Sequence, residues 1–219
     1  MVLLLAAVSG LAAAQISYAF FPRQPAAWAV SALSAVLITF SGLFGTISLL
    51  AGVLVGVLLA GAQIVVAPVR NKPPVEVFQM ALRSAVPVGL ATGAMVALSG
   101  VEIGAIIGLV LLISAYEVAD FTVGSGSSNA IEGPVSGIVA LGSVAFVLWT
   151  TPPVPFVPTT IMMFSLLAAV AAPLGQIYAS ALLPRGATWA PAFRRLDSYL
   201  IAAPLWLLLL EQAPVSTTT

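Results

Sequence analysis

The chain has 219 residues, of which 61% are hydrophobic and only 6% charged, and its seven basic and seven acidic residues give a formal net charge of zero. Soluble domains carry roughly 25% charged residues, so this composition predicts an integral membrane protein. A nucleic-acid partner is not expected, because balanced charge offers it no basic surface. The chain has neither cysteine nor histidine, which excludes disulfides, thiolate nucleophiles and zinc sites built from them.

The chain divides into about eight apolar segments, each close to the roughly 20 residues needed to cross a membrane. They cover residues 1–21, 26–44, 46–68, 84–100, 103–117, 134–151, 156–183 and 198–212. The first segment has no basic stretch before its apolar run, so we expect a retained helix rather than a secretory signal. The sequence predicts an all-α polytopic membrane protein. We expect a single membrane domain, 1–219, with N-terminal helices in 1–100 and a second set in 101–219.

Two breaks separate neighbouring segments. Residues 41–45, Ser-Gly-Leu-Phe-Gly, interrupt an uncharged run that is too long for one helix, and glycine tolerates backbone angles that end a helix. The prolines at 152, 153, 155 and 158 provide the second break, because proline lacks the amide hydrogen that a helix uses.

The basic residues predict an orientation. They fall around Arg23, between Arg70 and Arg83, and between Arg185 and Arg195, which are the loops after segments one, three and seven. With eight spans these loops share one side. The positive-inside rule makes that side cytoplasmic and places both termini outside, in a multi-pass protein of the plasma membrane. The loop expected at 117–133 then also faces the cytoplasm.

Acidic and small polar residues gather in that loop. Glu117 and Asp120 are three residues apart, so on a continuing helix their carboxylates share one face. They could hold Mg²⁺ and, through it, phosphates, or they could simply solvate the end of the segment. Residues 124–129, Gly-Ser-Gly-Ser-Ser-Asn, form either a flexible turn or a nest of backbone amides that cradles a phosphate.

Arg194, Arg195 and Asp197 stand at the start of the last apolar segment. On residue type alone the arginines are positive-inside anchors and Asp197 is a helix N-cap. However, Arg195-Leu196-Asp197-Ser198 and the apolar stretch after it resemble the end of bacterial phosphatidate cytidylyltransferase, or CDP-diacylglycerol synthase, which reads G-H-G-G-x-x-D-R-x-D-S and continues into a helix. Residues 129–137 resemble that family's K-T-x-E-G-x-x-G-G, and residues 119–124 resemble its D-T-x-A-Y-x-x-G. The resemblance covers residues 105–212, and the eight expected spans also suit the family.

The resemblance implies a cytidylyl transfer, in which membrane phosphatidic acid attacks the α-phosphate of CTP with the help of Mg²⁺. It implies phosphatidic acid or another anionic phospholipid as the membrane partner and CTP as the second substrate. Family members can be dimeric, so a second copy or a partner membrane protein remains open. Taken together with the resemblance, the candidate site residues are Asp197, Arg195 and Glu132 for catalysis, Ser198, Arg185, Arg194, Ser180 and Asn129 for substrate binding, and Glu117, Asp120 and Asp197 for the metal ion.

Several positions depart from the family pattern. Arg194 replaces the first aspartate of D-R-x-D-S, residues 188–191 read Thr-Trp-Ala-Pro instead of G-H-G-G, and Gln176 replaces an acid. A cation at a ligand position repels Mg²⁺, and losing one stabilising donor costs roughly 10²–10³ in rate. We therefore expect a catalytically degraded member with a lipid- or partner-binding role. An active divergent enzyme and a small transporter or structural subunit are the alternatives.

Overall fold

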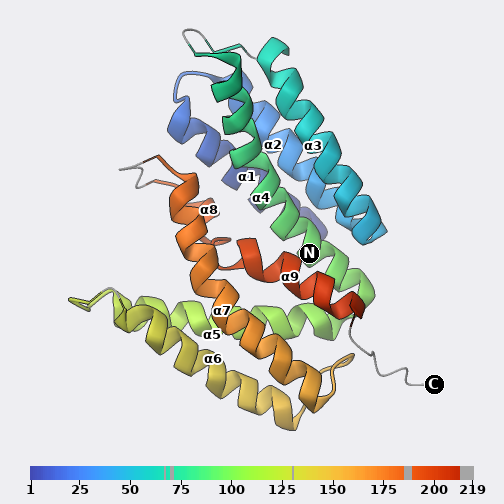
Figure 1. Cartoon of the computed structure of the whole chain (residues 1–219), viewed down its shortest axis with the longest axis vertical. Helices are drawn as coiled ribbons and strands as arrows, with labels where there is room; N and C mark the ends of the chain where they lie inside the picture. The colour runs from blue at the N-terminus through green and yellow to red at the C-terminus, as the bar shows by residue number, and fades with distance from the viewer. Residues whose placement is uncertain (67, 70–71, 130, 185–188, 213–219) are drawn as a thin grey trace.

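A computed structural model describes residues 1–66, 68–69, 72–129, 131–184 and 189–212, and these residues contain helices and no strand (Figure 1). Among these described residues seven helices are long and apolar enough to cross a membrane, the second of them counted from Pro25 through the short turn that ends at Phe44. They are α1 (Val2–Phe20), α2 (Pro25–Ser41), α3 (Thr46–Val66), α4 (Pro74–Val101), α5 (Ile103–Gly124), α6 (Glu132–Thr150) and α7 (Pro158–Leu182). The described chain is therefore that of an all-α polytopic membrane protein, as its composition predicts.

The eighth expected span is a shorter helix. After α7 come a single turn, α8 (Pro191–Arg194), and then α9 (Tyr199–Gln212), which has 14 residues. At 1.5 Å per residue α9 is about 21 Å long, against a hydrocarbon core of about 30 Å. The sequence did not predict α8, because its four residues are too few to show a helical pattern.

Two boundaries differ from the expected spans. Helix α4 begins at Pro74 rather than at residue 84, because proline at the first turn starts a helix and the polar first turns can extend beyond the hydrocarbon core. Helix α5 continues to Gly124, so the loop expected from residue 117 is wrong in its first part. Glu117 and Asp120 consequently lie on a helix.

Both expected breaks are confirmed. Gly42–Phe44 form a short 3-10 turn, η1, and Gly45 follows with a φ of 91°, in the region that favours glycine. The chain between Thr150 and Pro158 is not helical.

The helices form two groups that meet along α4 (Figure 1). In the first group α1, α2, α3 and α4 pack against one another, and in the second α5 packs on α6, α6 on α7, and α7 on α9. Contacts of α4 with α9 and α5, and of α1 with α8, join the groups. Because successive spans alternate in direction, the ends that connect α1 to α2 and α3 to α4, and the end of α7, lie toward the upper left of Figure 1, and the α5–α6 connection lies below them at the left.

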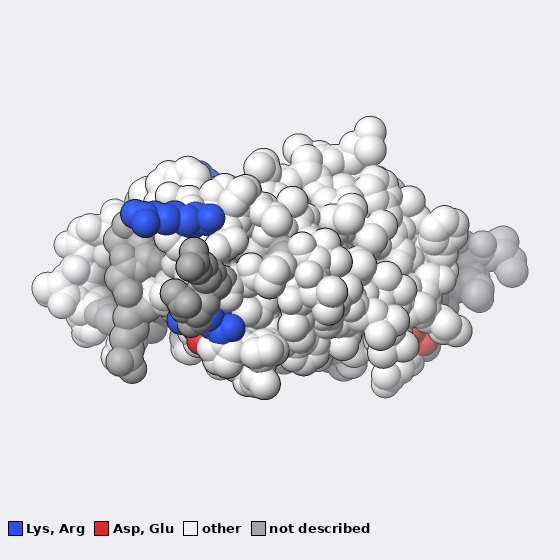
Figure 2. All heavy atoms as spheres, turned by 90° about the horizontal axis from the view of Figure 1, so that it is seen from above, with Lys and Arg blue, Asp and Glu red and all other residues white. Residues whose placement is uncertain are grey.

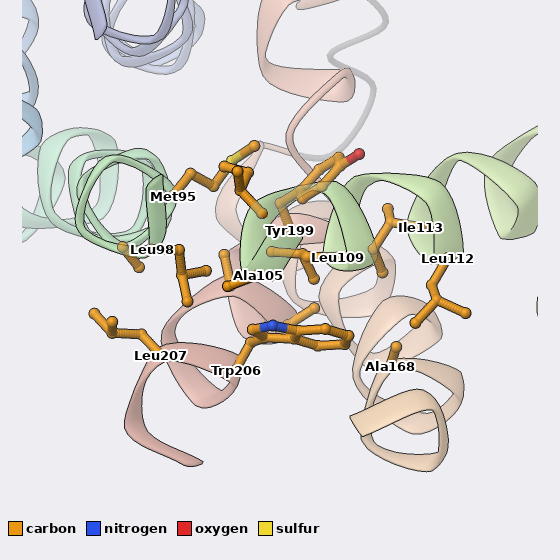
Figure 3. Packing of buried hydrophobic residues seen from close by; sticks show 14 of the residues in the cluster. Met95, Leu98, Ala105, Leu109, Leu112, Ile113, Ala168, Tyr199, Trp206 and Leu207 are labelled. Atoms are coloured by element: carbon orange, nitrogen blue, oxygen red, sulfur yellow. The ribbon is translucent and has the colours of Figure 1, made fainter. Parts of the chain in front are cut away.

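The largest buried cluster fills the space between α4, α5, α7 and α9 (Figure 3). Trp206 of α9 is fully buried at its centre, and its ring meets those of Phe164 and Phe156 edge-to-face at centroid distances of 4.8 and 5.9 Å. Such aromatic pairs contribute about 0.5–1.5 kcal/mol beyond their buried area. This packing fixes α9, and with it the turn that precedes α9, against α5 and α7.

Candidate functional site

The C-terminal half of α5 is held tightly against α6 by glycines. A Cβ atom at Gly137 would lie 2.6 Å from the Tyr116 ring, and one at Gly133 would lie 2.5 Å from Asp120 Oδ1. The Ser136 hydroxyl also donates a hydrogen bond to the Ala119 carbonyl at 3.0 Å. The part of α5 that carries the acidic side chains is therefore pinned in position.

A second close approach places the turn before α9 against α7. A Cβ atom at Gly175 would lie 2.4 Å from the Asp197 carbonyl oxygen, so any other residue there would push the turn away. The backbone at Asp197 and Ser198 thus rests on α7. As a result, the described residues of 119–124, 131–137, 175–184 and 195–198, which carry the resemblance, lie around one site.

A hydrogen-bonded chain of side chains crosses from α5 to α7 and back. The Tyr116 hydroxyl donates to Gln176 Oε1 at 3.0 Å, and Gln176 Nε2 donates to Asp120 Oδ2 at 2.9 Å. The neutral amide can satisfy both partners at once because it offers an acceptor and a donor. A carboxylate at position 176 could accept from Tyr116 but would repel Asp120.

These elements surround a mixed-charge pocket of about 390 Å³. Helix α5, helix α7, α8 and the turn before α9 all contribute to it. Its lining residues are Glu117, Asp120, Phe121, Gln176, Pro191, Arg194, Arg195 and Asp197. Two further cavities adjoin it, one of about 460 Å³ that shares Asp120 and Gln176 and one of about 290 Å³ that shares Glu117 and Arg195.

The opposite charges of the pocket are not paired with each other. Among the described residues the one ion pair within 4 Å joins Lys72, just before α4, to Glu76 in the first turn of α4. Arg194 Nη1 instead donates to the Ser180 hydroxyl at 3.3 Å, and the exposed Arg195 side chain has no carboxylate within 4 Å in the described ranges. Both guanidinium groups thus remain available to an anion.

The Asp197 carboxylate is held by its own turn. Its Oδ1 accepts a hydrogen bond from the Ser198 backbone N–H at 2.8 Å, and α9 begins only at Tyr199, so Asp197 does not bond into the first turn as an N-cap would. Burial raises the pKa of Asp197 above its ordinary value, while the Ser198 N–H and the Arg194 guanidinium act in the opposite direction. This carboxyl group is therefore easier to protonate than an exposed aspartate.

Most of the sequence-predicted site residues meet here, but not all. The pocket contains Glu117, Asp120, Asp197, Arg194 and Arg195; Ser180 joins it through Arg194, and the buried Ser198 lies beside Asp197. Asn129 lines the adjoining cavity. Glu132 does not line the pocket: its Oε2 accepts a hydrogen bond from Ser127 and closes the α5–α6 loop. Arg185 lies outside the described residues.

Sequence reasoning did not identify Tyr116 or Phe121 as part of the site. The signal for Tyr116 was its spacing, since it stands four residues before Asp120 and therefore shares its helix face. Gln176 was recognised only as the replacement of an acid. Its two hydrogen bonds across the helices depend on the packing of α5 against α7, which no local pattern reveals.

The described residues do not fit the Mg²⁺ site expected from three carboxylates. No three Asp or Glu side chains in the described ranges lie where they could share one metal ion. In addition, Gln176 donates a hydrogen bond to Asp120 Oδ2, and the Ser198 backbone N–H donates one to Asp197 Oδ1. Mg²⁺ needs near-octahedral oxygen ligands at about 2.1 Å, so amide N–H groups pointing at these oxygens compete with it directly.

No protein-family model, curated protein or solved structure matches this chain.

Proposed function

We propose that this membrane protein binds the phosphate-bearing headgroup of an anionic phospholipid, such as phosphatidic acid, and does not transfer a cytidylyl group. In this proposal it is a degraded member of the phosphatidate cytidylyltransferase family. The observation that carries the proposal is the pocket between α5, α7 and the 191–197 turn, where Arg194 and Arg195 face a cavity and, in the described part of the chain, neither has a carboxylate within 4 Å.

Arginine is suited to this ligand. Its planar guanidinium presents several N–H donors that match two phosphate oxygens at once, and charge-assisted hydrogen bonds of this kind are roughly twice as strong as neutral ones. Two of the neighbouring carboxylates already accept hydrogen bonds from Gln176 and Ser198. A headgroup phosphate would therefore meet two guanidinium groups without a carboxylate within 4 Å, and two acids that already accept hydrogen bonds.

Two residues, Gln176 and Arg194, account for the proposed loss of catalysis. Both stand where the resembled family has an acid, and the Gln176 amide donates to the acid that remains, Asp120. Phosphoryl chemistry depends chiefly on positioned metal ions and cations. No three carboxylates form a cluster in the described part of the chain, and a Mg²⁺ ion held by one or two carboxylates and the CTP phosphates would share Asp120 and Asp197 with the hydrogen bonds from Gln176 and Ser198.

The proposed orientation puts this pocket at the cytoplasmic face of the plasma membrane. The visible Lys and Arg side chains gather toward the left in Figure 2, which is the side of Figure 1 where the α1–α2 and α5–α6 connections lie. Under the positive-inside rule that side faces the cytoplasm and the N-terminus lies outside.

A second candidate function is an active but divergent lipid-phosphate cytidylyltransferase. It is favoured by Glu117, Asp120 and Asp197 sharing one pocket with Arg195, rather than being scattered over the molecule. The same convergence offers no support for the third alternative, a small transporter or structural subunit.

One assay separates the first two candidates. The purified full chain in nanodiscs is given phosphatidic acid, Mg²⁺ and labelled CTP, and formation of CDP-diacylglycerol is measured together with phosphatidic acid binding by vesicle flotation. We expect binding without turnover. Turnover above background that disappears in Asp197→Ala would overturn the proposal of a degraded enzyme in favour of the active one.

Substitutions of the two arginines test the proposed binding of phosphatidic acid. Replacing both Arg194 and Arg195 with Gln should weaken binding to phosphatidic acid vesicles by at least about 10-fold, since even one hydrogen bond to a charged group contributes about 1.5–3 kcal/mol. Arg23→Gln is the matched control, because Arg23 is exposed on the same basic side but does not line the pocket. An equal loss of vesicle binding in the two variants would show that binding depends only on nonspecific surface charge, which would contradict the proposal.

A further inference from the structure

A second pocket lies on the other side of the 189–195 segment. It has a volume of about 580 Å³, and it is lined by Leu11, Ala14, Gln15, Tyr18, Trp28 and Trp189. None of the described residues lining it carries a charge, and three of the six are aromatic. This cavity shares no lining residue with the mixed-charge pocket described above.

The three aromatic rings stand at steep angles to one another. The Tyr18 ring lies 5.1 Å from the Trp28 ring at an interplanar angle of 67°, and 6.3 Å from the Trp189 ring at 72°. Tyr18 thus packs edge-to-face against both indoles, and the three rings form one continuous aromatic lining of the pocket. Aromatic residues are common near the ends of membrane helices as interfacial anchors, but anchoring alone does not require three rings to enclose a cavity.

Hydrogen bonds fix this arrangement before any ligand arrives. Trp28 Nε1–H donates to the Phe21 carbonyl at 2.7 Å, which sets the orientation of its indole. Gln15 Oε1 accepts from the backbone N–H groups of Ala192 and Phe193, at 3.0 and 3.3 Å, and so ties α8 to α1. Because Trp189 stands two residues before α8, this tie anchors the segment that carries it.

The chemistry of the lining selects the kind of ligand. Aromatic faces attract a cation through the ring quadrupole, and cages of such rings recognise quaternary ammonium groups. A primary ammonium would need hydrogen-bond acceptors, yet the described lining has no carboxylate, and Gln15 Oε1 already accepts two bonds. A trimethylammonium group has no N–H to satisfy and suits an apolar aromatic wall.

We propose that Tyr18, Trp28 and Trp189 form an aromatic cage for a quaternary ammonium group. The trimethylammonium can come from a choline phospholipid, whose headgroup lies at the depth of the ends of α1 and α2, or from a free choline-type solute. The site is independent of the phosphate-binding function proposed above.

The test follows N-methyl protons by saturation-transfer NMR on the purified full chain in maltoside detergent, which contains no quaternary ammonium. Dihexanoyl phosphatidylcholine and free choline are added in separate arms to distinguish a lipid source from a soluble one. We expect saturation transfer in at least one arm. Transfer in neither arm overturns the proposal.

Two ligand controls test the charge and the methyl groups. Dihexanoyl phosphatidylethanolamine retains a cation with N–H groups, and 3,3-dimethylbutanol is the uncharged isostere of choline. We expect both to bind at least about 5-fold more weakly than their choline counterparts, because a desolvated cation–π contact contributes about 1–2 kcal/mol. Equal binding of the uncharged isostere would show a merely apolar cavity and contradict the cage.

Two variants test the cage itself. Trp189→Ala should weaken binding about 5- to 30-fold, and it should leave the fold intact because Trp189 is 64% exposed and lies outside the helices. Tyr18→Phe keeps the ring and should preserve binding. Trp149→Ala, which removes an exposed indole from α6 away from the pocket, is the matched control. Wild-type affinity in Trp189→Ala would contradict the assignment.

Discussion

Gln176 Nε2 donates a hydrogen bond to Asp120 Oδ2 at 2.9 Å, although 56 residues separate the two in the chain. The same amide accepts from Tyr116 through its oxygen. It thereby joins α5 to α7 and occupies an oxygen that a metal ion would need. This small network links the stability of the site to the chemistry that we propose the site has lost.

Replacing this amide tests its structural contribution. Gln176→Ala leaves the Asp120 carboxylate and the Tyr116 hydroxyl without their partner, and we expect a loss of about 1–3 kcal/mol in the free energy of unfolding. Thermal or denaturant unfolding in detergent measures it. Gln79→Ala, on the exposed face of α4, should change stability by less than about 0.5 kcal/mol. Equal effects at the two positions would show that the network contributes nothing.

Gly175 tests the close approach of the turn to α7. Gly175→Ala places a Cβ atom 2.4 Å from the Asp197 carbonyl, and overpacking of this kind costs about 1–3 kcal/mol. The matched control is Gly142→Ala in α6, where a Cβ would meet nothing within 4 Å. Because alanine is the better helix former, we expect that control to stabilise the protein by up to about 1 kcal/mol. If the unfolding midpoint falls in Gly175→Ala and rises in Gly142→Ala, relative to the wild type, the contact is confirmed.

Asp197 predicts a pH dependence with a definite sign. Burial raises its pKa in the folded protein, so between its ordinary pKa and the raised value the folded state binds more protons than the unfolded state. Relative to low pH, the free energy of unfolding therefore falls as pH rises through that window. Asp197→Asn should remove this slope and be more stable than wild type at neutral pH. Unfolding midpoints measured in detergent across the acidic range provide the test, and a slope that the substitution leaves unchanged would count against the assignment.

The buried indole of Trp206 is expected to control the position of α9. Trp206→Ala opens a cavity beside Phe164 and Phe156, and substitutions of this size in packed cores cost about 3–5 kcal/mol. Trp149→Ala removes an indole that is 43% exposed on α6 and should cost far less. Unfolding curves of the two variants in the same detergent provide the comparison.

The absence of cysteine allows a direct topology test. Single cysteines at Ser128, in the α5–α6 loop, and at Thr151, after α6, lie at opposite ends of one helix, and both positions are exposed. Treated in intact cells with a membrane-impermeant maleimide, Thr151→Cys should be labelled and Ser128→Cys should react only after lysis. The reverse pattern would invert the proposed orientation.

The sequence by itself determined the class of protein and most helix boundaries. Its apolar content left no alternative to a membrane, and glycine and proline set the breaks at 41–45 and 152–158 because their backbone restrictions are local. It was less accurate where a boundary depends on polar residues, as at α5, since helical hydrogen bonds continue beyond the last apolar side chain and carry Glu117 and Asp120 on the helix.

Only the tertiary structure decided which side chains meet. Three sets of contacts join residues from different elements of the chain. They are the approach of Gly175 to Asp197, the hydrogen bond from Gln176 to Asp120, and the ring contacts among Tyr18, Trp28 and Trp189. Such contacts depend on helix packing angles and on small residues at the crossings, whose combined geometry no local pattern encodes. The packing of helices also decided the position of Glu132. Because α6 starts beside the end of α5, where Gly133 allows close contact, Glu132 accepts a hydrogen bond from Ser127 in the connecting loop and does not line the pocket.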